Sequence, residues 1–218
     1  MKTPHTPLEQ GRKQYDQGAL HRSDLPDSPI DLLRAWLKVA EEVVGEDFQA
    51  LVLSTLDASG FPTGRVVLAR GLDEEGIRFF TNYQSEKARN LQDHPQASAT
   101  FFWKELERQV RVRGVVRKLS VDDSDRYFAS RPRESQLGAW MSPQSEVIPE
   151  EMDWESSRQT WEQRFRDLPD IPRPPHWGGF VLSIQAIEFW QGRPNRLHDR
   201  WEYALQASGV WQIVRRSP

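Results

Sequence analysis

The stretch GGFVLSIQAIEFWQG (178–192) decides the fold class, because this long apolar run predicts a β-strand. Two further strands are predicted after it, LHDRWEYAL (197–205) and WQIVRR (211–216). Upstream, RQVRVRGVVRKL (108–119) alternates valine with glutamine and arginine, so one face of that strand is polar. Together these segments predict a chain that is rich in strands.

The rest of the chain adds more strands and a few helices. A helix is expected over residues 29–44, with Ser28 at its cap and Pro29 in its first turn. Many antiparallel strands with few helices predict a mainly β fold of the α+β class, a β-barrel with peripheral helices. We expect residues 1–28, which proline and glycine interrupt, to be a flexible segment, and residues 29–218 to be a single domain. The other predicted strands are 50–57, 63–71, 77–82 and 97–103, and the other predicted helices are 85–92, 121–131 and 149–167.

Composition excludes several classes of protein. The 218 residues contain no cysteine, which rules out disulfides, zinc–thiolate sites, iron–sulfur clusters and a thiol nucleophile. No apolar run reaches the roughly 18 residues of a membrane span. The first 15 residues lack the apolar core of a signal peptide, so a cytoplasmic location is expected. A net charge of −3 argues against a general nucleic-acid binder, and the five histidines have no metal-ligand spacing.

Arginine and tryptophan are both frequent. The chain has nine tryptophans, and its 29 basic residues include only six lysines. Because the arginine fork grips phosphate or carboxylate with two hydrogen bonds, one interpretation is a site for an anionic, aromatic ligand. The other interpretation is a plain compositional bias, and composition does not choose between them.

Three short motifs could bind an anion. Arg65 and Arg70 lie five residues apart on a predicted strand and so point to opposite faces. The segment from Thr81 to Lys87 enters a helix with Ser85 as a plausible cap, although the carboxylate of Glu86 weakens the anion interpretation. Tyr127, Arg131 and Ser135 follow one another at four-residue steps, with Pro132 expected to end the helix between them. Ion pairs, ordinary capping and a solvated helix end are the alternatives left open.

The richest motif is EFWQGRPNRLHDR (188–200), which brings Trp190 close to a run of charged residues. Arg196, His198 and Arg200 are expected to alternate along one strand face, and like-charge repulsion from the two arginines would lower the histidine pKa. Such a face suits a site where cations stabilise developing negative charge, although a surface ladder paired with acidic neighbours is the alternative. From the residues alone, the sequence indicates a β-barrel that binds a phosphorylated ligand.

Seven motifs in order resemble one family over nearly the whole chain. They are GALHRSDLP (18–26), RVVL (65–68), ERQV (107–110), SRPRESQLGAW (130–140), QS (144–145), WGGF (177–180) and EFWQG…RLHDR (188–200). With them the chain resembles pyridoxine/pyridoxamine 5′-phosphate oxidases, which use FMN to make pyridoxal 5′-phosphate. The resemblance implies a split β-barrel homodimer with FMN at the subunit interface. It also implies hydride transfer from substrate C4′ to flavin N5, and reoxidation of the flavin by molecular oxygen to give hydrogen peroxide.

The resemblance also implies a site. Arg196 and His198 are expected to lie over the pyridine ring and to act in catalysis. Residues implied to bind FMN are Arg65, Val66, Val67, Leu68, Phe80, Thr81, Ser85, Lys87, Gln109, Gln144, Ser145, Trp190 and Arg200. Those implied to bind the substrate are Arg12, Tyr15, Arg70, Tyr127, Arg131, Ser135, Arg196 and His198, with Arg12 and Tyr15 on a mobile N-terminal segment.

This chain departs from the family pattern at three positions. Arg70 replaces the usual lysine, Glu86 replaces an arginine beside the FMN phosphate, and Phe80 replaces a tyrosine. Two other functions therefore stay open: a related FMN oxidase of a secondary-metabolite pathway, such as the phenazine type, and a non-catalytic module that binds flavin or pyridoxal phosphate. The phenazine relatives would be expected to lack the substrate-phosphate residues that this chain has.

Overall fold

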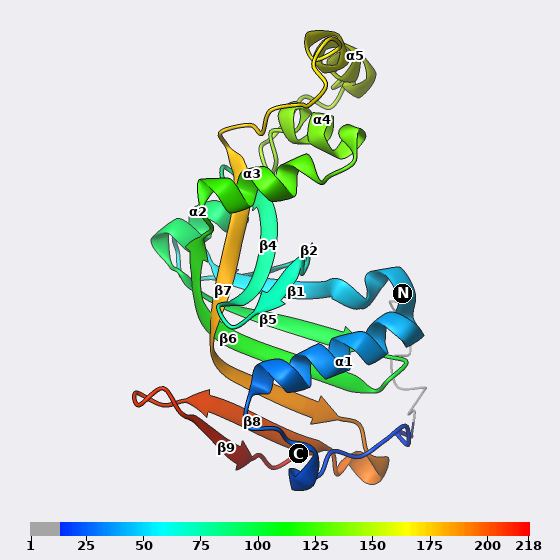
Figure 1. Cartoon of the computed structure of the whole chain (residues 1–218), viewed down its shortest axis with the longest axis vertical. Coiled ribbons are helices and arrows are strands. Elements are labelled where there is room, and N and C mark those ends of the chain that lie inside the picture. The colour runs from blue at the N-terminus through cyan, green and yellow to red at the C-terminus, as the bar shows by residue number, and fades with distance from the viewer. Residues whose placement is uncertain (1–13) are drawn as a thin grey trace, which may run out of the picture.

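The computed structural model describes residues 14–218, which form one nine-stranded sheet with helices around it (Figure 1). The helices are α1 (Pro29–Val44), α2 (Glu86–Asp93), α3 (Val121–Ala129), α4 (Arg133–Met141) and α5 (Trp154–Arg164), with 3-10 turns at Arg22–Asp24, Gly45–Gln49 and Pro194–Arg196. The strands are β1 (Ala50–Leu56), β2 (Pro62–Leu68), β3 (Gly71–Asp73), β4 (Gly76–Asn82), β5 (Gln96–Trp103), β6 (Arg108–Lys118), β7 (Trp177–Gln191), β8 (Asp199–Leu205) and β9 (Trp211–Arg215).

Strand β7 runs the length of the sheet (Figure 1). Its first part pairs with β4, its last part pairs with β8, and β6 pairs with nearly all of its other edge, each time antiparallel. A strand with neighbours on both edges and cover on both faces must be apolar almost throughout. Val181, Ile187 and Phe189 are accordingly buried completely. Both ends of the molecule are therefore attached to the same strand.

The core lies between the sheet and α1. This helix buries Leu33, Trp36 and Ala40 on one face, and the Trp36 ring meets the edge of Phe189 with 5.2 Å between ring centroids. A second, smaller cluster of Phe128, Leu137, Phe165, Ile171 and Trp177 holds α3, α4 and α5 at the other end of β7. Among residues 14–218, no helix is long and apolar enough to cross a membrane.

Most predicted elements are confirmed, with four corrections. The predicted strand 63–71 is two strands, β2 and β3, and the predicted helix 149–167 is limited to α5. Helix α4 was not predicted, because Pro132 in the sequence indicates only the end of the preceding helix. In the structure Pro132 is also the N-cap residue of α4. The predicted strand 197–205 begins only at Asp199, because residues 194–196 form a 3-10 turn in which Asn195 and Arg196 have positive φ.

Residues 14–28 lie against the lower end of the sheet. Leu20 and Leu25 are buried, the Leu20 amide donates to the Asp199 carboxylate (3.1 Å), and the Trp201 indole donates to the Leu20 carbonyl (2.9 Å). Arg12 lies outside the described residues. The division of the chain into a flexible segment over 1–28 and one domain over 29–218 stays a prediction.

A β-bulge bends β7 against β6. Arg113 faces Ala186 but Gly114 faces Ile184, so Gln185 is the extra residue. A methyl group on Gly114 would overlap the carbonyl of Ser183, which is backbone and cannot turn away. Only glycine allows the two strands to approach this closely.

We expect Gly114→Ala to lower the free energy of unfolding by about 1–3 kcal/mol or more, the usual cost of overpacking. Gly138→Ala is the matched control, because the same methyl group on α4 meets nothing within 4 Å. Alanine there should leave stability unchanged or raise it by up to about 1 kcal/mol. Urea unfolding of both variants at one protein concentration gives the comparison, and equal midpoints would contradict the close approach.

Candidate functional site

One cluster of polar side chains gathers where β4 ends and α2 begins; we call Arg65, Thr81, Ser85, Lys87 and Gln144 the Lys87 cluster. The Lys87 ammonium donates to the Thr81 hydroxyl (3.2 Å), the Ser85 hydroxyl (3.1 Å) and the Gln144 amide oxygen (3.1 Å). Ser85 stands at the N-cap position of α2, although its hydroxyl donates to the Asn82 carbonyl instead of capping the helix. Lys87 is only 8% exposed, so a buried cation is surrounded by neutral oxygens.

Arg65 brings a second positive charge to this cluster. It lies on the core-facing side of β2, opposite Leu53, and donates to the hydroxyls of Thr55 and Thr63 (2.7 Å each). Burial, reinforced by repulsion from Arg65 and opposed by Glu86, lowers the Lys87 pKa to about 8. Two cations near one buried point favour an anion there.

Glu86 adds a carboxylate to the edge of this cluster. Its carboxylate contacts Arg65 at 3.3 Å, and the neighbouring Arg89 pairs with Glu146. Glu86 is half exposed and so holds one nitrogen of Arg65 from the solvent side.

A second cluster, Phe80, Tyr127, Arg131 and Trp177, lies at the same end of β7; we call it the Arg131 cluster. Phe80 stacks on Tyr127 with 3.7 Å between centroids, and the Arg131 guanidinium lies 4.5 Å from the centroid of Trp177. Burial lowers the Arg131 pKa. Tyr127 raises this pKa in part, and the positive charge of Arg70 lowers it further. The Nη1 of Arg131 is buried with no hydrogen-bond partner among residues 14–218, so this cluster offers an unused donor.

The chain around Arg131 does not form one helix. Helix α3 ends at Ala129 and α4 starts at Arg133, so Tyr127, Arg131 and Ser135 come from three successive pieces of chain. Arg70 approaches from the end of β2, donates to Gln49 (2.9 Å), and lines a cavity of about 430 Å³ together with Tyr127.

A third cluster, Tyr15, Gln109, Trp190, His198 and Arg200, lies at the opposite end of β7; we call it the Trp190 cluster. Strand register places Gln109, Trp190 and Arg200 in one row across β6, β7 and β8, on the face of the sheet away from the core. The His198 ring lies 4.6 Å from Trp190 and 5.6 Å from Tyr15.

His198 is held as a neutral ring. Its Nδ1 accepts a hydrogen bond from the backbone N–H of Arg193 (3.1 Å), and an N–H group can only donate. The neutral ring therefore carries its proton on Nε2. Burial, followed by repulsion from Arg196 and opposed by Asp199, lowers the His198 pKa.

The predicted strand face of Arg196, His198 and Arg200 is wrong. Only Arg200 lies in β8, since Arg196 sits in the 3-10 turn with φ of 63° and His198 follows in irregular chain. The positive φ values break the alternation that a strand would give. Arg200 is also not among the groups that lower the His198 pKa. The histidine still faces the aromatic rings, but for a different reason than strand periodicity.

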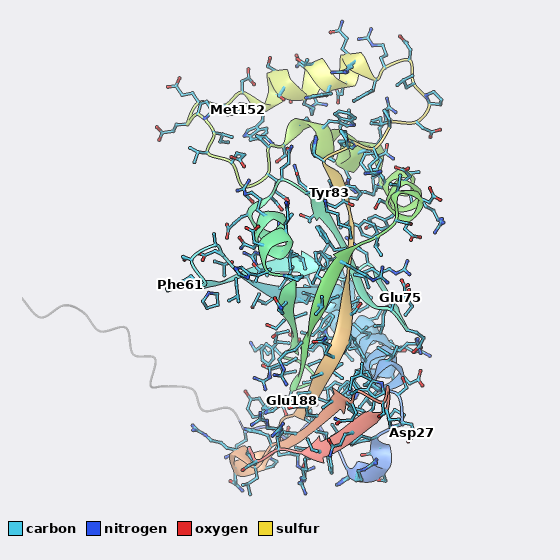
Figure 2. The ribbon with its side chains drawn as sticks, turned by 90° about the vertical axis from the view of Figure 1, so that its left-hand side faces the viewer. Asp27, Phe61, Glu75, Tyr83, Met152 and Glu188 are labelled. Carbon is cyan, nitrogen blue, oxygen red and sulfur yellow. The ribbon has the colours of Figure 1, made fainter. Side chains whose placement is uncertain are left out.

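The predicted site residues thus fall into two sets. The Lys87 and Arg131 clusters adjoin the start of β7, because Thr81 faces Gly178 and the ring centroid of Phe80 lies 5.7 Å from that of Trp177. The Trp190 cluster adjoins its end, about 40 Å further along the strand. Figure 2 shows the same elongation, with Tyr83 in the upper part of the molecule and Glu188 in the lower part. One small ligand cannot touch both sets in a single chain.

The remaining predicted residues lie around these clusters. Val66 and Leu68 point to the outer face of β2, Val67 points inward, and Ser145 follows Gln144 with a φ of 71°. Sequence reasoning missed Thr55, Thr63 and Asn90. The Asn90 amide donates to both threonine hydroxyls, which in turn accept hydrogen bonds from Arg65. Such neutral supporting residues carry no motif.

The chain is similar to known proteins over almost its whole length. A family model described as pyridoxamine 5′-phosphate oxidase matches residues 37–168, and one described as the pyridoxine 5′-phosphate oxidase C-terminal dimerisation region matches residues 177–218. The pyridoxine/pyridoxamine 5′-phosphate oxidase of Salinibacter ruber is 44% identical, over 95% of this chain and 97% of its own. That of Synechocystis is 47% identical, over 95% and 96%.

Two solved structures share the fold. PhzG from Burkholderia lata 383, in complex with tetrahydrophenazine-1-carboxylic acid, is 28% identical with a TM-score of 0.83, and the match covers 94% of this chain and 100% of that one. A pyridoxamine 5′-phosphate oxidase-related, FMN-binding protein from Nostoc punctiforme is 19% identical with a TM-score of 0.73, over 89% and 100%, and shows likeness of fold alone.

The Lys87 cluster predicts pH-dependent anion binding. With the pKa of Lys87 at about 8, its ammonium is intact below that pH and lost above it. We expect millimolar sulfate, whose charge is constant over this range, to raise the melting temperature more at pH 7 than at pH 9.5. The difference should vanish in Lys87→Met and persist in Lys38→Met, an exposed lysine on α1. A sulfate effect in the wild type that does not change with pH would contradict the assignment.

Proposed function

Since the chain belongs to the pyridoxamine 5′-phosphate oxidase family, we propose that it is an FMN-dependent oxidase that converts pyridoxine or pyridoxamine 5′-phosphate to pyridoxal 5′-phosphate. Relatives of that name match almost the whole chain at 44–47% identity. The observation that carries the proposal is that cations and aromatic rings lie at both ends of β7, and that each end has one buried guanidinium nitrogen, Arg131 Nη1 or Arg200 Nε, with no partner among residues 14–218. The predicted cytoplasmic location stays a prediction from the sequence.

The residues fit FMN at both of its ends. At the phosphate end, the buried Lys87 ammonium has three neutral oxygens as hydrogen-bond partners and Arg65 close by, a setting that a phosphate dianion would complete. At the ring end, Arg200 keeps a buried Nε with no partner among residues 14–218. Lys87, Arg65, Thr81 and Ser85 would hold the phosphate, and Gln109, Trp190 and Arg200 would contact the flavin.

The two ends must then come from two copies of the chain. We propose a homodimer with two sites, each built from the Lys87 and Arg131 clusters of one copy and the Trp190 cluster of the other. The outer face of the sheet supports this, because Val52, Val66 and Phe102 are 43%, 66% and 56% exposed on it. A row of large apolar side chains on one sheet face is typical of a surface that a partner covers. The match of residues 177–218 to a dimerisation region supports the same arrangement.

The substrate phosphate fits the Arg131 cluster. Arg131 offers its unused Nη1, Arg70 adds a second positive charge, and Tyr127 lies between the stacked Phe80 and the cavity that Arg70 lines. Ser135 would add a hydroxyl from the first turn of α4. Because Arg70 is a planar fork where relatives have a point charge, it grips a phosphate in two directions and fixes its orientation more tightly.

His198 would donate a hydrogen bond to the substrate and would not act as a base. When bound, FMN supplies the two-electron acceptor, which molecular oxygen reoxidises. The chain's own residues bind and orient: Arg196 brings positive charge next to His198, and Trp190 and Tyr15 flank the histidine ring. With Nδ1 occupied by the Arg193 amide, the remaining Nε2–H can only donate. The substrate must therefore lose its alcohol or amine proton to another acceptor, such as solvent.

A phenazine-type FMN oxidase is the second candidate, which the TM-score of 0.83 to PhzG favours. Against it stand the lower identity of 28% and the phosphate-binding character of the Arg131 cluster. A binding module without catalysis is the third, and activity alone separates it from the other two.

We expect the purified protein to be yellow, to release FMN on denaturation, and to form hydrogen peroxide when pyridoxamine 5′-phosphate is added in air. Unphosphorylated pyridoxamine should be a much poorer substrate, because the Arg131 cluster would stay unsatisfied. Arg131→Gln should raise KM for the phosphorylated substrate by roughly tenfold or more, with FMN affinity unchanged. A colourless protein would contradict the cofactor, and flavin without peroxide formation would favour the binding module.

Glu86 should weaken FMN binding, since its carboxylate holds one nitrogen of Arg65 beside the proposed phosphate position. We expect Glu86→Arg to tighten FMN binding by less than about tenfold, which corresponds to under roughly 1.4 kcal/mol. Titration of the apoprotein with FMN measures this, and the gain should shrink in high salt. Glu42→Arg, on the exposed face of α1, controls for net charge. Weaker binding in Glu86→Arg would mean that Glu86 has a structural role at the start of α2.

A further inference from the structure

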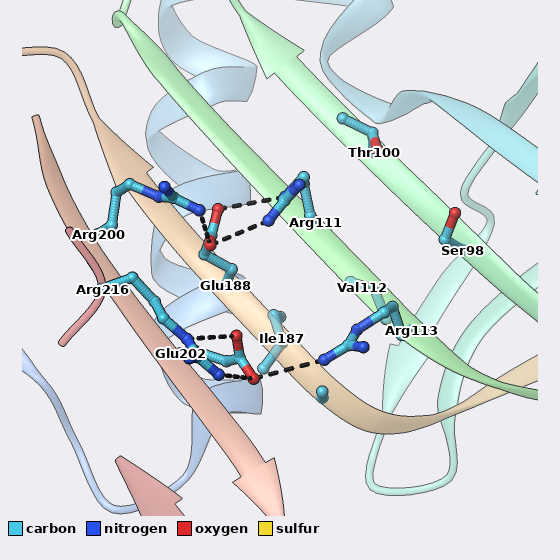
Figure 3. A pocket seen from close by; sticks show the side chains of 11 residues that line it. Ser98, Thr100, Arg111, Val112, Arg113, Ile187, Glu188, Arg200, Glu202 and Arg216 are labelled. Atoms are coloured by element: carbon cyan, nitrogen blue, oxygen red, sulfur yellow. Dashed lines mark hydrogen bonds and ion pairs between the residues drawn. The ribbon is translucent and has the colours of Figure 1, made fainter. Parts of the chain in front are cut away.

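Two buried glutamates on the outer face of the sheet each join two arginines (Figure 3). Glu188 accepts two hydrogen bonds from Arg111 (3.2 and 3.0 Å) and one from Arg200 (2.7 Å). Glu202 accepts two from Arg216 (3.1 and 3.2 Å) and one from Arg113 (3.4 Å). All six residues line one cavity of about 510 Å³.

The two glutamates are close structural equivalents. They face each other across β7 and β8 in the strand register, and they are 4% and 9% exposed. A carboxylate buried this deeply needs its cationic partners, and loss of one partner is expensive. The networks differ in one respect that matters: only Glu188 holds Arg200, which lies in the same row as Trp190 and Gln109.

Two of the three guanidinium nitrogens of Arg200 have acceptors in the protein, and the third has none among residues 14–218. Its Nη2 donates to Glu188 at 2.7 Å, and its Nη1 donates to the Ser217 carbonyl at 2.7 Å. Its Nε is buried with no partner among residues 14–218. A buried donor without an acceptor is costly unless a ligand completes it. The guanidinium plane is therefore set by protein partners so that one donor remains for something that the chain does not supply.

We propose that Glu188 is a positioning residue for the cofactor: it fixes the guanidinium of Arg200 so that Nε–H is presented to an acceptor atom of the flavin ring. The proposal rests on the proposed function, because it assumes that FMN binds at the Trp190 cluster. Arg111 completes the charge of Glu188 on the opposite side, so the carboxylate cannot turn away from Arg200 without breaking a bidentate pair. Glu202 is buried to a similar degree and has the same charge, but its arginine partners are Arg113 and Arg216 and do not include Arg200.

The test compares matched pairs of variants, Glu188→Gln and Glu188→Asp with Glu202→Gln and Glu202→Asp. The amide removes the charge, whereas aspartate keeps the charge and shortens the reach, so the pair separates charge from position. The measurements are the FMN dissociation constant of the apoprotein and the midpoint potential of the bound flavin, with thermal unfolding as the check of folding. Neither quantity requires turnover.

For both Glu188 variants we expect the FMN dissociation constant to rise by roughly fivefold to tenfold. We also expect the midpoint potential to fall, because a misplaced Arg200 no longer stabilises negative charge on the reduced flavin. Both Glu202 variants should lose a similar amount of thermal stability and keep the flavin constants of the wild type.

Three outcomes would overturn the proposal. A midpoint potential that rises in Glu188→Gln and stays unchanged in Glu188→Asp would show that Glu188 acts by charge alone. Equal FMN dissociation constants and midpoint potentials in the Glu188 and Glu202 variants would show that both networks are purely structural. The same conclusion would follow if Glu188→Gln failed to fold and Glu188→Asp bound FMN as tightly as the wild type. A wild-type protein that binds no FMN would instead overturn the proposed function.

Discussion

β7 is shared by both halves of the sheet, and the whole arrangement of the proposed site depends on this. Its first part pairs with β4 and its last part with β8, so it carries the Arg131 and Lys87 clusters at one end and the Trp190 cluster at the other. The separation of about 40 Å along an extended strand is fixed by backbone geometry and cannot be closed by side-chain movement. The strand is hydrogen-bonded along both edges and buried nearly throughout. The two halves of one ligand site can then meet only between copies of the chain.

The buried cations of the Lys87 and Arg131 clusters lower the stability of the folded chain but favour the binding of anions. Lys87 and Arg131 are cations that the fold buries with few or no carboxylates, and burial lowers the pKa of both. Such groups destabilise the folded chain until an anion arrives. The outer-face networks around Glu188 and Glu202 show the opposite solution, with each buried carboxylate matched by two arginines. The unmatched cations therefore mark where anions belong, and the matched ones hold the sheet, although Arg200 among them keeps Nε without a partner among residues 14–218.

Sequence patterns were sufficient for the strands but insufficient for the site. The alternation in β6 and the apolar run of β7 predicted strands that the structure confirms, because both depend on local burial. Helix α4 was missed because Pro132 ends one helix and begins another, and only tertiary packing of Leu137 decides between the two. The strand expected to carry Arg196 and His198 failed at Asn195, where a positive φ turns the chain. Residues that act through others, such as Asn90 and Glu188, have no sequence signal because their partners are distant in the chain.

The shared site is tested most directly by mixing two variants of low activity. Arg131→Ala removes a residue of one end and His198→Ala removes a residue of the other, so each homodimer has two damaged sites. After joint unfolding and refolding with FMN, half of the dimers should be mixed, and each mixed dimer should contain one intact site. With substrate below the wild-type KM, we expect recovery of about a quarter of the wild-type oxidase activity, while either variant refolded alone stays at about a tenth or less. No recovery, with mixed dimers demonstrated by mass spectrometry, would mean that each site is built within one chain and would contradict the account.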